Sequence, residues 1–173
     1  RNHGMTKTLT QRYSHGKPWD YDVLEVGYNF RLDEIRAALG INQLKRIESL
    51  NSLRRKAFRY YNFKLRNIED IIIPTIKDDD SHACHLYIIK IGGKCRISRD
   101  DLFKKLTKDN VTTTVHYKPL HKFSAYKKIS GNIKDLKNSE KLYTRILSLP
   151  FYPQISKKAQ DRVVECIKTA ITS

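Results

Sequence analysis

The sequence has few cysteines and glycines and no long hydrophobic run. Its 173 residues include three cysteines, Cys84, Cys95 and Cys166, which form no CxxC pair. So small and odd a set is a poor disulfide framework, and we expect a reducing compartment, the cytoplasm. The seven glycines build no Gly-rich loop, so neither a Walker A nor a dinucleotide-binding motif occurs. No apolar run approaches the roughly 20 residues of a membrane-spanning helix, so we expect no membrane association.

A start methionine is also missing. The first residue is Arg1, and no apolar signal segment follows it. Such a beginning is expected of a truncated expression product, a proteolytic product or a partial gene product. Residues 1–31 show little periodicity, and we expect them to form an irregular segment that needs another body to lie against.

Basic side chains outnumber acidic ones by a wide margin. Lys and Arg total 34 against 18 Asp and Glu, a formal net charge of +16. The excess is spread along the chain and forms no single basic arm, which favours general attraction of anions by a positive surface potential. A basic nucleic-acid-binding module is the alternative interpretation, although no motif of that class supports it. The hydrophobic share of 39% is enough for a core, so global disorder is not expected.

Residues 32–67 carry the strongest periodic pattern in the sequence. Apolar residues recur here at steps near three and four, the helical period. Asp33 and Glu34 begin the run and basic residues crowd its later part, as the helix dipole favours. Gly40 predicts a kink or a close contact, so the segment is one long kinked helix or two consecutive helices. A helix of roughly 50 Å is long for one small domain and is typical of a link between two bodies.

The remaining residues, 68–173, alternate between strand and helix patterns. Strands are predicted at His85–Ile91, Val111–Tyr117 and Ile146–Leu149. Helices are predicted after the N-cap residues Ser98 and Ser156 and near Leu136–Ile146. The order β-α-β-α-β-α around a small sheet predicts an α/β (α+β) sandwich.

The histidines and cysteines form no convincing metal site. His82, Cys84 and His85 lie close together in sequence, but a zinc site needs three or four convergent ligands and no second cluster has matching spacing. We therefore expect no metal. Nothing marks a thiol as activated, so the cysteines are interpreted as structural.

Two short segments place polar and aromatic groups where binding groups tend to gather. One predicted strand ends in His116 and Tyr117, and Pro119 fixes the exit of the chain. Ahead of the long helix, Asn29 and Arg31 can donate hydrogen bonds to an anion near a helix start. Ordinary loop and capping roles stay open for both segments.

Four blocks of sequence are informative when they are taken together. They are Arg1–Met5, Gly27–Leu44, Val115–His121 with Tyr126, and Leu147–Pro150. In this order and at this spacing they resemble the DegT/DnrJ/EryC1/StrS aminotransferases. The resemblance covers nearly the whole chain, but it extends only to the C-terminal half of the family.

The resemblance implies a fold-type-I enzyme that depends on pyridoxal 5'-phosphate. Members usually form homodimers and aminate keto sugars linked to nucleotides, often with glutamate as the amino donor, in surface-polysaccharide or amino-sugar biosynthesis. By this resemblance, residues 1–31 are the trailing segment of the large cofactor-binding domain. Residues 32–67 are the linking helix or helix pair, and residues 68–173 are the C-terminal small α/β domain.

The resemblance also implies which site residues the chain holds. Asn29 matches the asparagine that reaches the cofactor phosphate of the neighbouring subunit, with Arg31 as a weaker candidate beside it. Substrate contacts are implied for Tyr28, His116, Tyr117 and His121.

No lysine stands in the family's Ser-x-x-x-x-Lys context, so no catalytic residue is assigned and the chain alone is expected to be inactive. A non-catalytic homologue of the family stays open as an alternative.

Overall fold

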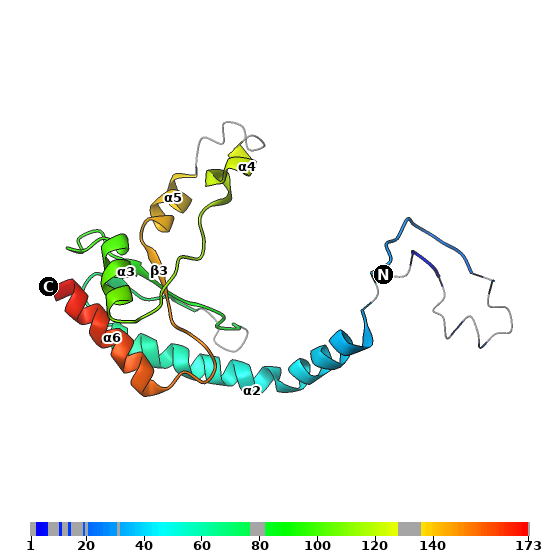
Figure 1. Cartoon of the computed structure of the whole chain (residues 1–173), viewed down its shortest axis with the longest axis horizontal. Coiled ribbons are helices and arrows are strands. Elements are labelled where there is room, and N and C mark those ends of the chain that lie inside the picture. Colours follow the sequence, from blue (N-terminus) through cyan, green and yellow to red (C-terminus); the bar gives the residue numbers. More distant parts are fainter. Residues whose placement is uncertain are drawn as a thin grey trace. The chain divides into compact units, whose positions relative to one another are not determined.

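The computed structural model describes residues 3–6, 11, 14, 19, 21–30, 32–76, 82–127 and 136–172. The chain divides into two compact units, residues 1–47 and 48–173. The boundary lies inside the long helix α2, Glu34–Leu65, which is labelled in Figure 1. The two units are described separately below.

The first unit is held by backbone pairing between two irregular segments. Met5 and Val23 form an isolated antiparallel bridge, and the His3 amide donates to the Tyr28 carbonyl at 3.2 Å. The two backbone segments lie so close that a Cβ added to Gly27 would sit 2.3 Å from the backbone nitrogen of Gly4. Glycine is therefore required at position 27 for this close approach.

Helix α2 confirms the predicted long helix, as one continuous element. The Asp33 carboxylate accepts a hydrogen bond from the Arg36 amide at 2.9 Å and so caps the N-terminus. Gly40 faces open space, with nothing within 4 Å of an added Cβ, so no close contact explains this glycine. The buried residues all lie in the C-terminal half of the helix, at Ala57, Phe58, Tyr61 and Leu65.

The second unit contains a three-stranded antiparallel sheet in the order β1-β2-β3. Its strands are β1 (Ile71–Ile72), β2 (Tyr87–Ile91) and β3 (Ile146–Leu149). Ile71 pairs with Ile91, and Tyr87 pairs with Leu149. The second and third of these strands confirm two predictions, whereas Ile71–Ile72 was not predicted as a strand.

The predicted strand Val111–Tyr117 is wrong. The segment makes only one isolated bridge, in which Thr114 and Ser148 exchange backbone hydrogen bonds of 3.2 and 2.8 Å. The β-branched residues favour an extended backbone, but a strand also needs a partner along its length, and β3 is only four residues long. The predicted order β-α-β-α-β-α is corrected accordingly, since the described residues between β1 and β2 hold no helix.

The rest of the described part of the unit is helical apart from connecting segments. The helices are α3 (Arg99–Lys108), the 3₁₀ turn η1 (Leu120–Lys122), α4 (Ser124–Lys127), α5 (Lys137–Tyr143) and α6 (Lys157–Thr172). Helix α3 contacts β3. Both predicted N-caps are confirmed. The Ser98 hydroxyl accepts from the Asp101 amide, and the Ser156 hydroxyl accepts from the Ala159 amide, each at 3.1 Å. Among the described helices, none has the length and apolar character needed to cross a membrane.

An aromatic cluster joins the C-terminal half of α2 to β2. The Tyr87 ring lies 4.9 Å from the Phe58 ring and 4.8 Å from the Tyr61 ring, between centroids. The buried hydroxyls are satisfied, because Tyr61 donates to the Pro150 carbonyl at 3.1 Å and Tyr87 donates to Asn62 at 2.7 Å. Burial raises the pKa of both tyrosines, so both stay neutral at physiological pH.

One buried amide joins α6 to α2. Gln160 is 1% exposed, and its side-chain nitrogen donates to the Ala57 carbonyl at 2.8 Å. We expect Gln160→Met, which keeps the volume but removes the donor, to lower the free energy of unfolding by about 1–2 kcal/mol. Urea denaturation would measure the change. Lys158→Met, at an exposed position of the same helix, is the control and should change it by less than about 0.5 kcal/mol. An unchanged stability in Gln160→Met would contradict the structural role of this bond.

Candidate functional site

A pocket of about 700 Å³ opens in the second unit. Part of its lining comes from the segment that runs from the Thr114 bridge through α4, namely His116, Tyr117, Lys118, Pro119, Leu120, His121 and Tyr126. The rest comes from α5, the residue before it and the start of β3, namely Leu136, Ser139, Leu142, Tyr143 and Ile146. Figure 1 shows α4, α5 and β3, the elements that bound it. The volume lies in the range of small-molecule sites, and the lining combines apolar surface with a few polar groups.

His116 is held in place by the sheet. Its Nδ1 atom lies 2.9 Å from the hydroxyl of Ser148, a β3 residue that is 3% exposed. The backbone bridge between Thr114 and Ser148 fixes the chain two residues earlier. The His116 and Tyr117 rings meet edge to face, with centroids 4.6 Å apart, and the peptide bond between them is cis. The rigid sheet therefore sets the position of the first two pocket residues.

His121 connects the two sides of the pocket lining. Its Nε2 atom donates to the Glu140 carboxylate of α5 at 3.0 Å, and the Lys122 ammonium lies 3.6 Å from the same carboxylate oxygen. The hydrogen bond from His121, followed by the charge of Lys122, holds the pKa of the Glu140 carboxyl below its ordinary value. Glu140 therefore stays ionised at neutral pH and joins η1 to α5.

The structure brings together three of the predicted site residues. His116, Tyr117 and His121 all line the pocket, and Tyr117 is 70% exposed. Tyr28 and Asn29 lie in the first unit, where the Tyr28 ring stacks on Phe30 at 5.0 Å and the Asn29 side chain is exposed. Arg31 lies outside the described residues.

The helix pattern near Leu136–Ile146 by itself indicates no role in a site. Its residues Ser139, Leu142 and Tyr143 line the pocket. The available signal was their helical spacing of three and four, which places them on one face. The same spacing is equally typical of a helix that packs on a hydrophobic core. The pattern alone therefore could not show that these residues line a pocket.

No group of three or more His, Cys, Asp or Glu side chains converges as a metal site within the described part of the chain. The three cysteines form no disulfide within the described residues, and Cys84 is fully buried. Burial, followed by the charge of Asp109, raises the pKa of the Cys166 thiol, which makes it less reactive.

The sequence model of the DegT/DnrJ/EryC1/StrS aminotransferase family matches residues 1–168. The chain belongs to this family. Two curated relatives are each 34% identical to it. The spore coat polysaccharide biosynthesis protein SpsC of Bacillus subtilis matches over 98% of this chain and 44% of its own length. The UDP-4-amino-4,6-dideoxy-N-acetyl-beta-L-altrosamine transaminase of Campylobacter jejuni matches over 91% of this chain and 40% of its own.

Solved structures of sugar aminotransferases have the same fold. PseC of Helicobacter pylori, an aminotransferase of pseudoaminic acid biosynthesis, has a TM-score of 0.81 and 27% identity over 99% of this chain and 44% of its own. The putative sugar aminotransferase Spr1654 of Streptococcus pneumoniae, in its PMP form, has a TM-score of 0.80 and 26% identity over 99% of this chain and 43% of its own.

These similarities confirm the predicted family and fold class. The DegT/DnrJ/EryC1/StrS aminotransferases depend on pyridoxal 5'-phosphate, and Spr1654 has been solved in both its PLP and PMP forms. The chain spans less than half the length of these relatives. The activity, substrate and partners of the whole protein are therefore proposals, made below.

The His121–Glu140 contact predicts a pH-dependent contribution to stability. A carboxyl with a lowered pKa in the folded state stabilises that state above its unfolded pKa, and the contribution is lost as pH falls through the folded pKa. We expect Glu140→Gln to be less stable than the unmodified chain at neutral pH, with the difference vanishing below the ordinary titration range of glutamate. Thermal unfolding across that range would measure it.

A direct measurement is NMR titration of the Glu140 carboxyl carbon. In His121→Asn, the Glu140 carboxyl should titrate at a higher pH than in the unmodified chain, because the hydrogen bond from His121 is the largest cause of its lowered pKa. In the thermal-unfolding experiment with Glu140→Gln, the control is Glu165→Gln, which removes a carboxylate of α6 outside the pocket lining. An identical Glu140 titration in both chains would show that the contact does not form in solution.

Proposed function

We propose that this chain is the C-terminal part of a pyridoxal-phosphate-dependent aminotransferase that acts on a nucleotide-linked keto sugar. The overall exchange balances: glutamate and the keto sugar give 2-oxoglutarate and the amino sugar. The observation that carries the proposal is the meeting of His116, Tyr117 and His121 in one pocket of a chain that belongs to this family. The names of the relatives support a role in surface-polysaccharide or amino-sugar biosynthesis.

The pocket has the chemistry that a nucleotide-linked sugar requires. Exposed aromatic faces at Tyr117 and Tyr126 can stack on a base or a sugar ring. Lys118 supplies a positive charge for the diphosphate, and the histidines supply hydrogen-bonding groups for sugar hydroxyls. The UDP-linked sugar in the name of the Campylobacter relative makes a UDP-sugar our preferred substrate class.

The residues at the start of α2 fit the phosphate end of the cofactor. The Asn29 side chain is an exposed amide with no hydrogen bond to another described residue, so its donor is free to meet an anion. We assign Asn29 to the cofactor phosphate of the neighbouring subunit, with Arg31 as a second candidate and Tyr28 toward the substrate. When bound, pyridoxal 5'-phosphate would carry the amino group from the donor to the sugar.

The surface of α2 supports an assembly with further bodies. Ile35, Leu39 and Leu44 are 83%, 61% and 67% exposed. At 3.6 residues per turn, Ile35 and Leu39 share one face of the helix and Leu44 lies on the opposite face. Large apolar side chains on opposite faces of a helix are normally covered by neighbouring elements. We propose that the large domain and a second subunit cover it, with residues 1–31 trailing from the large domain and 68–173 forming the small domain of a cytoplasmic homodimer.

The decisive experiment uses the full-length protein encoded by the gene. We expect it to bind pyridoxal 5'-phosphate with a visible absorbance band and to transfer the amino group of glutamate to a UDP-linked 4-keto sugar. Cofactor binding without any transfer would favour the non-catalytic homologue. Failure to bind the cofactor, together with salt-sensitive binding of nucleic acid, would favour the basic binding module.

A substitution in the pocket separates sugar binding from reaction with the donor. In the full-length protein, Tyr117→Ala should raise the KM for the UDP-sugar about tenfold, equivalent to about 1.4 kcal/mol, through loss of an aromatic contact. The half-reaction with glutamate alone should be unchanged. Tyr152→Ala, at a 51% exposed position outside the pocket lining, is the matched control. Equal KM values for the two variants would exclude Tyr117 from the sugar site.

A further inference from the structure

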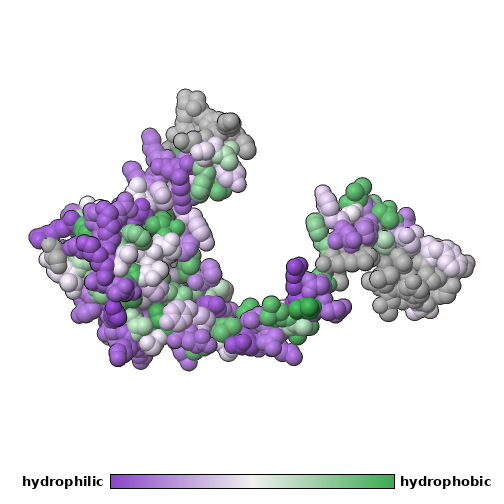
Figure 2. All heavy atoms as spheres, viewed as in Figure 1, coloured by the Kyte–Doolittle hydropathy of each residue, from purple (hydrophilic) through white to green (hydrophobic). Residues whose placement is uncertain are grey.

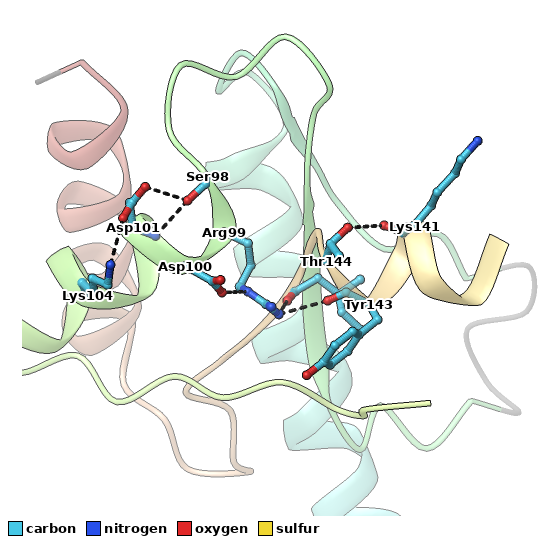
Figure 3. A network of polar contacts seen from close by, with 9 residues as sticks. Ser98, Arg99, Asp100, Asp101, Lys104, Lys141, Tyr143 and Thr144 are labelled. Carbon is cyan, nitrogen blue, oxygen red and sulfur yellow. Dashed lines mark hydrogen bonds and ion pairs between the residues drawn. The ribbon is translucent and has the colours of Figure 1, made fainter. Parts of the chain in front are cut away.

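Arg99 is not a lining residue of the pocket, but it contacts two residues that are. It is the first residue of α3, and its side chain is only 9% exposed. Its Nη1 atom donates to the Tyr143 carbonyl at 3.0 Å and to the Ile146 carbonyl at 3.2 Å. Its guanidinium carbon lies 5.4 Å from the centre of the Tyr143 ring. Figure 3 shows the Arg99 side chain reaching from α3 toward Tyr143, with Asp100 beside it.

These contacts fix the turn that connects α5 to β3. The last carbonyls of a helix have no partner within the helix and need one elsewhere. At the end of α5, the Arg145 amide donates to the Leu142 carbonyl at 3.0 Å, and Arg99 satisfies the carbonyl of Tyr143. Ile146, the other acceptor, is the first residue of β3. One side chain therefore holds both ends of the turn.

The contacts of Arg99 continue to the far side of the pocket. The Lys122 ammonium lies 6.0 Å from the centre of the Tyr143 ring and 3.6 Å from the Glu140 carboxylate. Glu140 in turn accepts the hydrogen bond of His121. Since Tyr143, Ile146 and His121 all line the pocket, a chain of contacts runs from Arg99 to both sides of the lining.

We infer that Arg99 is a positioning residue for this pocket: it sets the place of the Tyr143 ring and thereby the fit of the nucleotide-linked sugar. The inference rests on the function proposed above for the pocket. The charge of Arg99 is offset by Asp100, whose carboxylate pairs with the Nε atom. The Nη1 atom of the same guanidinium is directed at the turn between α5 and β3.

The chemistry of the contact requires arginine and not merely a positive charge. A guanidinium presents several N–H groups in a fixed plane, so it can pair with a carboxylate while another nitrogen bridges two carbonyls and its face meets an aromatic ring. The lysine ammonium is a single point of charge on a flexible stem and cannot make all these contacts at once. Arg99→Lys therefore keeps the charge and tests the geometry.

The test compares Arg99→Lys with Arg96→Lys in the full-length protein. Arg96 is an exposed residue three positions earlier that does not line this pocket, so it is the matched control. We expect Arg99→Lys to raise the KM for the UDP-sugar at least fivefold and to weaken binding of the probe UDP-N-acetylglucosamine by a similar factor. The half-reaction with glutamate should stay within twofold of the unmodified protein. A lower melting temperature with an unchanged KM would overturn the inference, because it would show a structural role only.

A double-substitution cycle tests whether Arg99 acts through Tyr143. In a Tyr143→Ala background, Arg99→Lys should produce little further loss of UDP-N-acetylglucosamine affinity, because the group that it positions is gone. Fully additive losses would contradict the proposed route.

A ligand-free measurement separates this inference from the proposed function. The NMR signals of the Tyr143 and His121 rings should move in Arg99→Lys and stay in place in Arg96→Lys. If UDP-N-acetylglucosamine does not bind the unmodified protein, the proposed substrate class fails, and these ring signals still decide whether Arg99 positions the lining. Unmoved signals would overturn the inference whether or not the probe binds.

Discussion

The second unit depends on one packing contact, between the C-terminal half of α2 and the face of β2. Phe58 and Tyr61 meet the Tyr87 ring, and all three side chains are nearly or fully buried. Aromatic side chains bury large areas, so a few of them can hold a helix on a small sheet. The paired hydroxyls of Tyr61 and Tyr87 make the contact specific, because an unpaired hydroxyl would be costly at this depth. α6 joins the same helix through Gln160.

This contact supports the pocket through the sheet. β2 pairs with β3, and β3 carries both Ser148, which holds His116, and Ile146, which lines the pocket. In a strand a shift of one residue turns every side chain to the opposite face, so the β2–β3 register determines whether Ser148 can reach His116. In Figure 2, hydrophilic residues cover most of the visible face of the second unit, with smaller hydrophobic areas between them. A rigid scaffold thus presents a binding surface built largely from irregular segments and short helices.

The two halves of α2 differ in burial. The C-terminal half is buried within its own unit, whereas Ile35, Leu39 and Leu44 of the N-terminal half are exposed. Exposing these three large apolar side chains to water is unfavourable, and the exposure would end if other bodies covered this half of the helix. The chain spans less than half the length of its relatives, so such bodies are expected. The side chains of Tyr28 and Asn29 are exposed as well, and the role proposed for Asn29 would place it against a neighbouring subunit.

The sequence by itself determined the elements whose signals are local. The period of α2, the caps Ser98 and Ser156 and the apolar runs of β2 and β3 each depend on neighbours a few residues away, and each was predicted correctly. The family blocks likewise indicated His116, Tyr117 and His121, which meet in one pocket.

Only the tertiary structure decided which segments pair and which side chains converge. Residues 111–117 have the composition of a strand but bridge β3 at a single position, and strand pairing is a long-range contact that composition does not encode. Arg99 and Tyr143 are 44 residues apart, so no local pattern could indicate that one holds the other. The pocket depends on such contacts, because its lining comes from segments that only the folded sheet brings together.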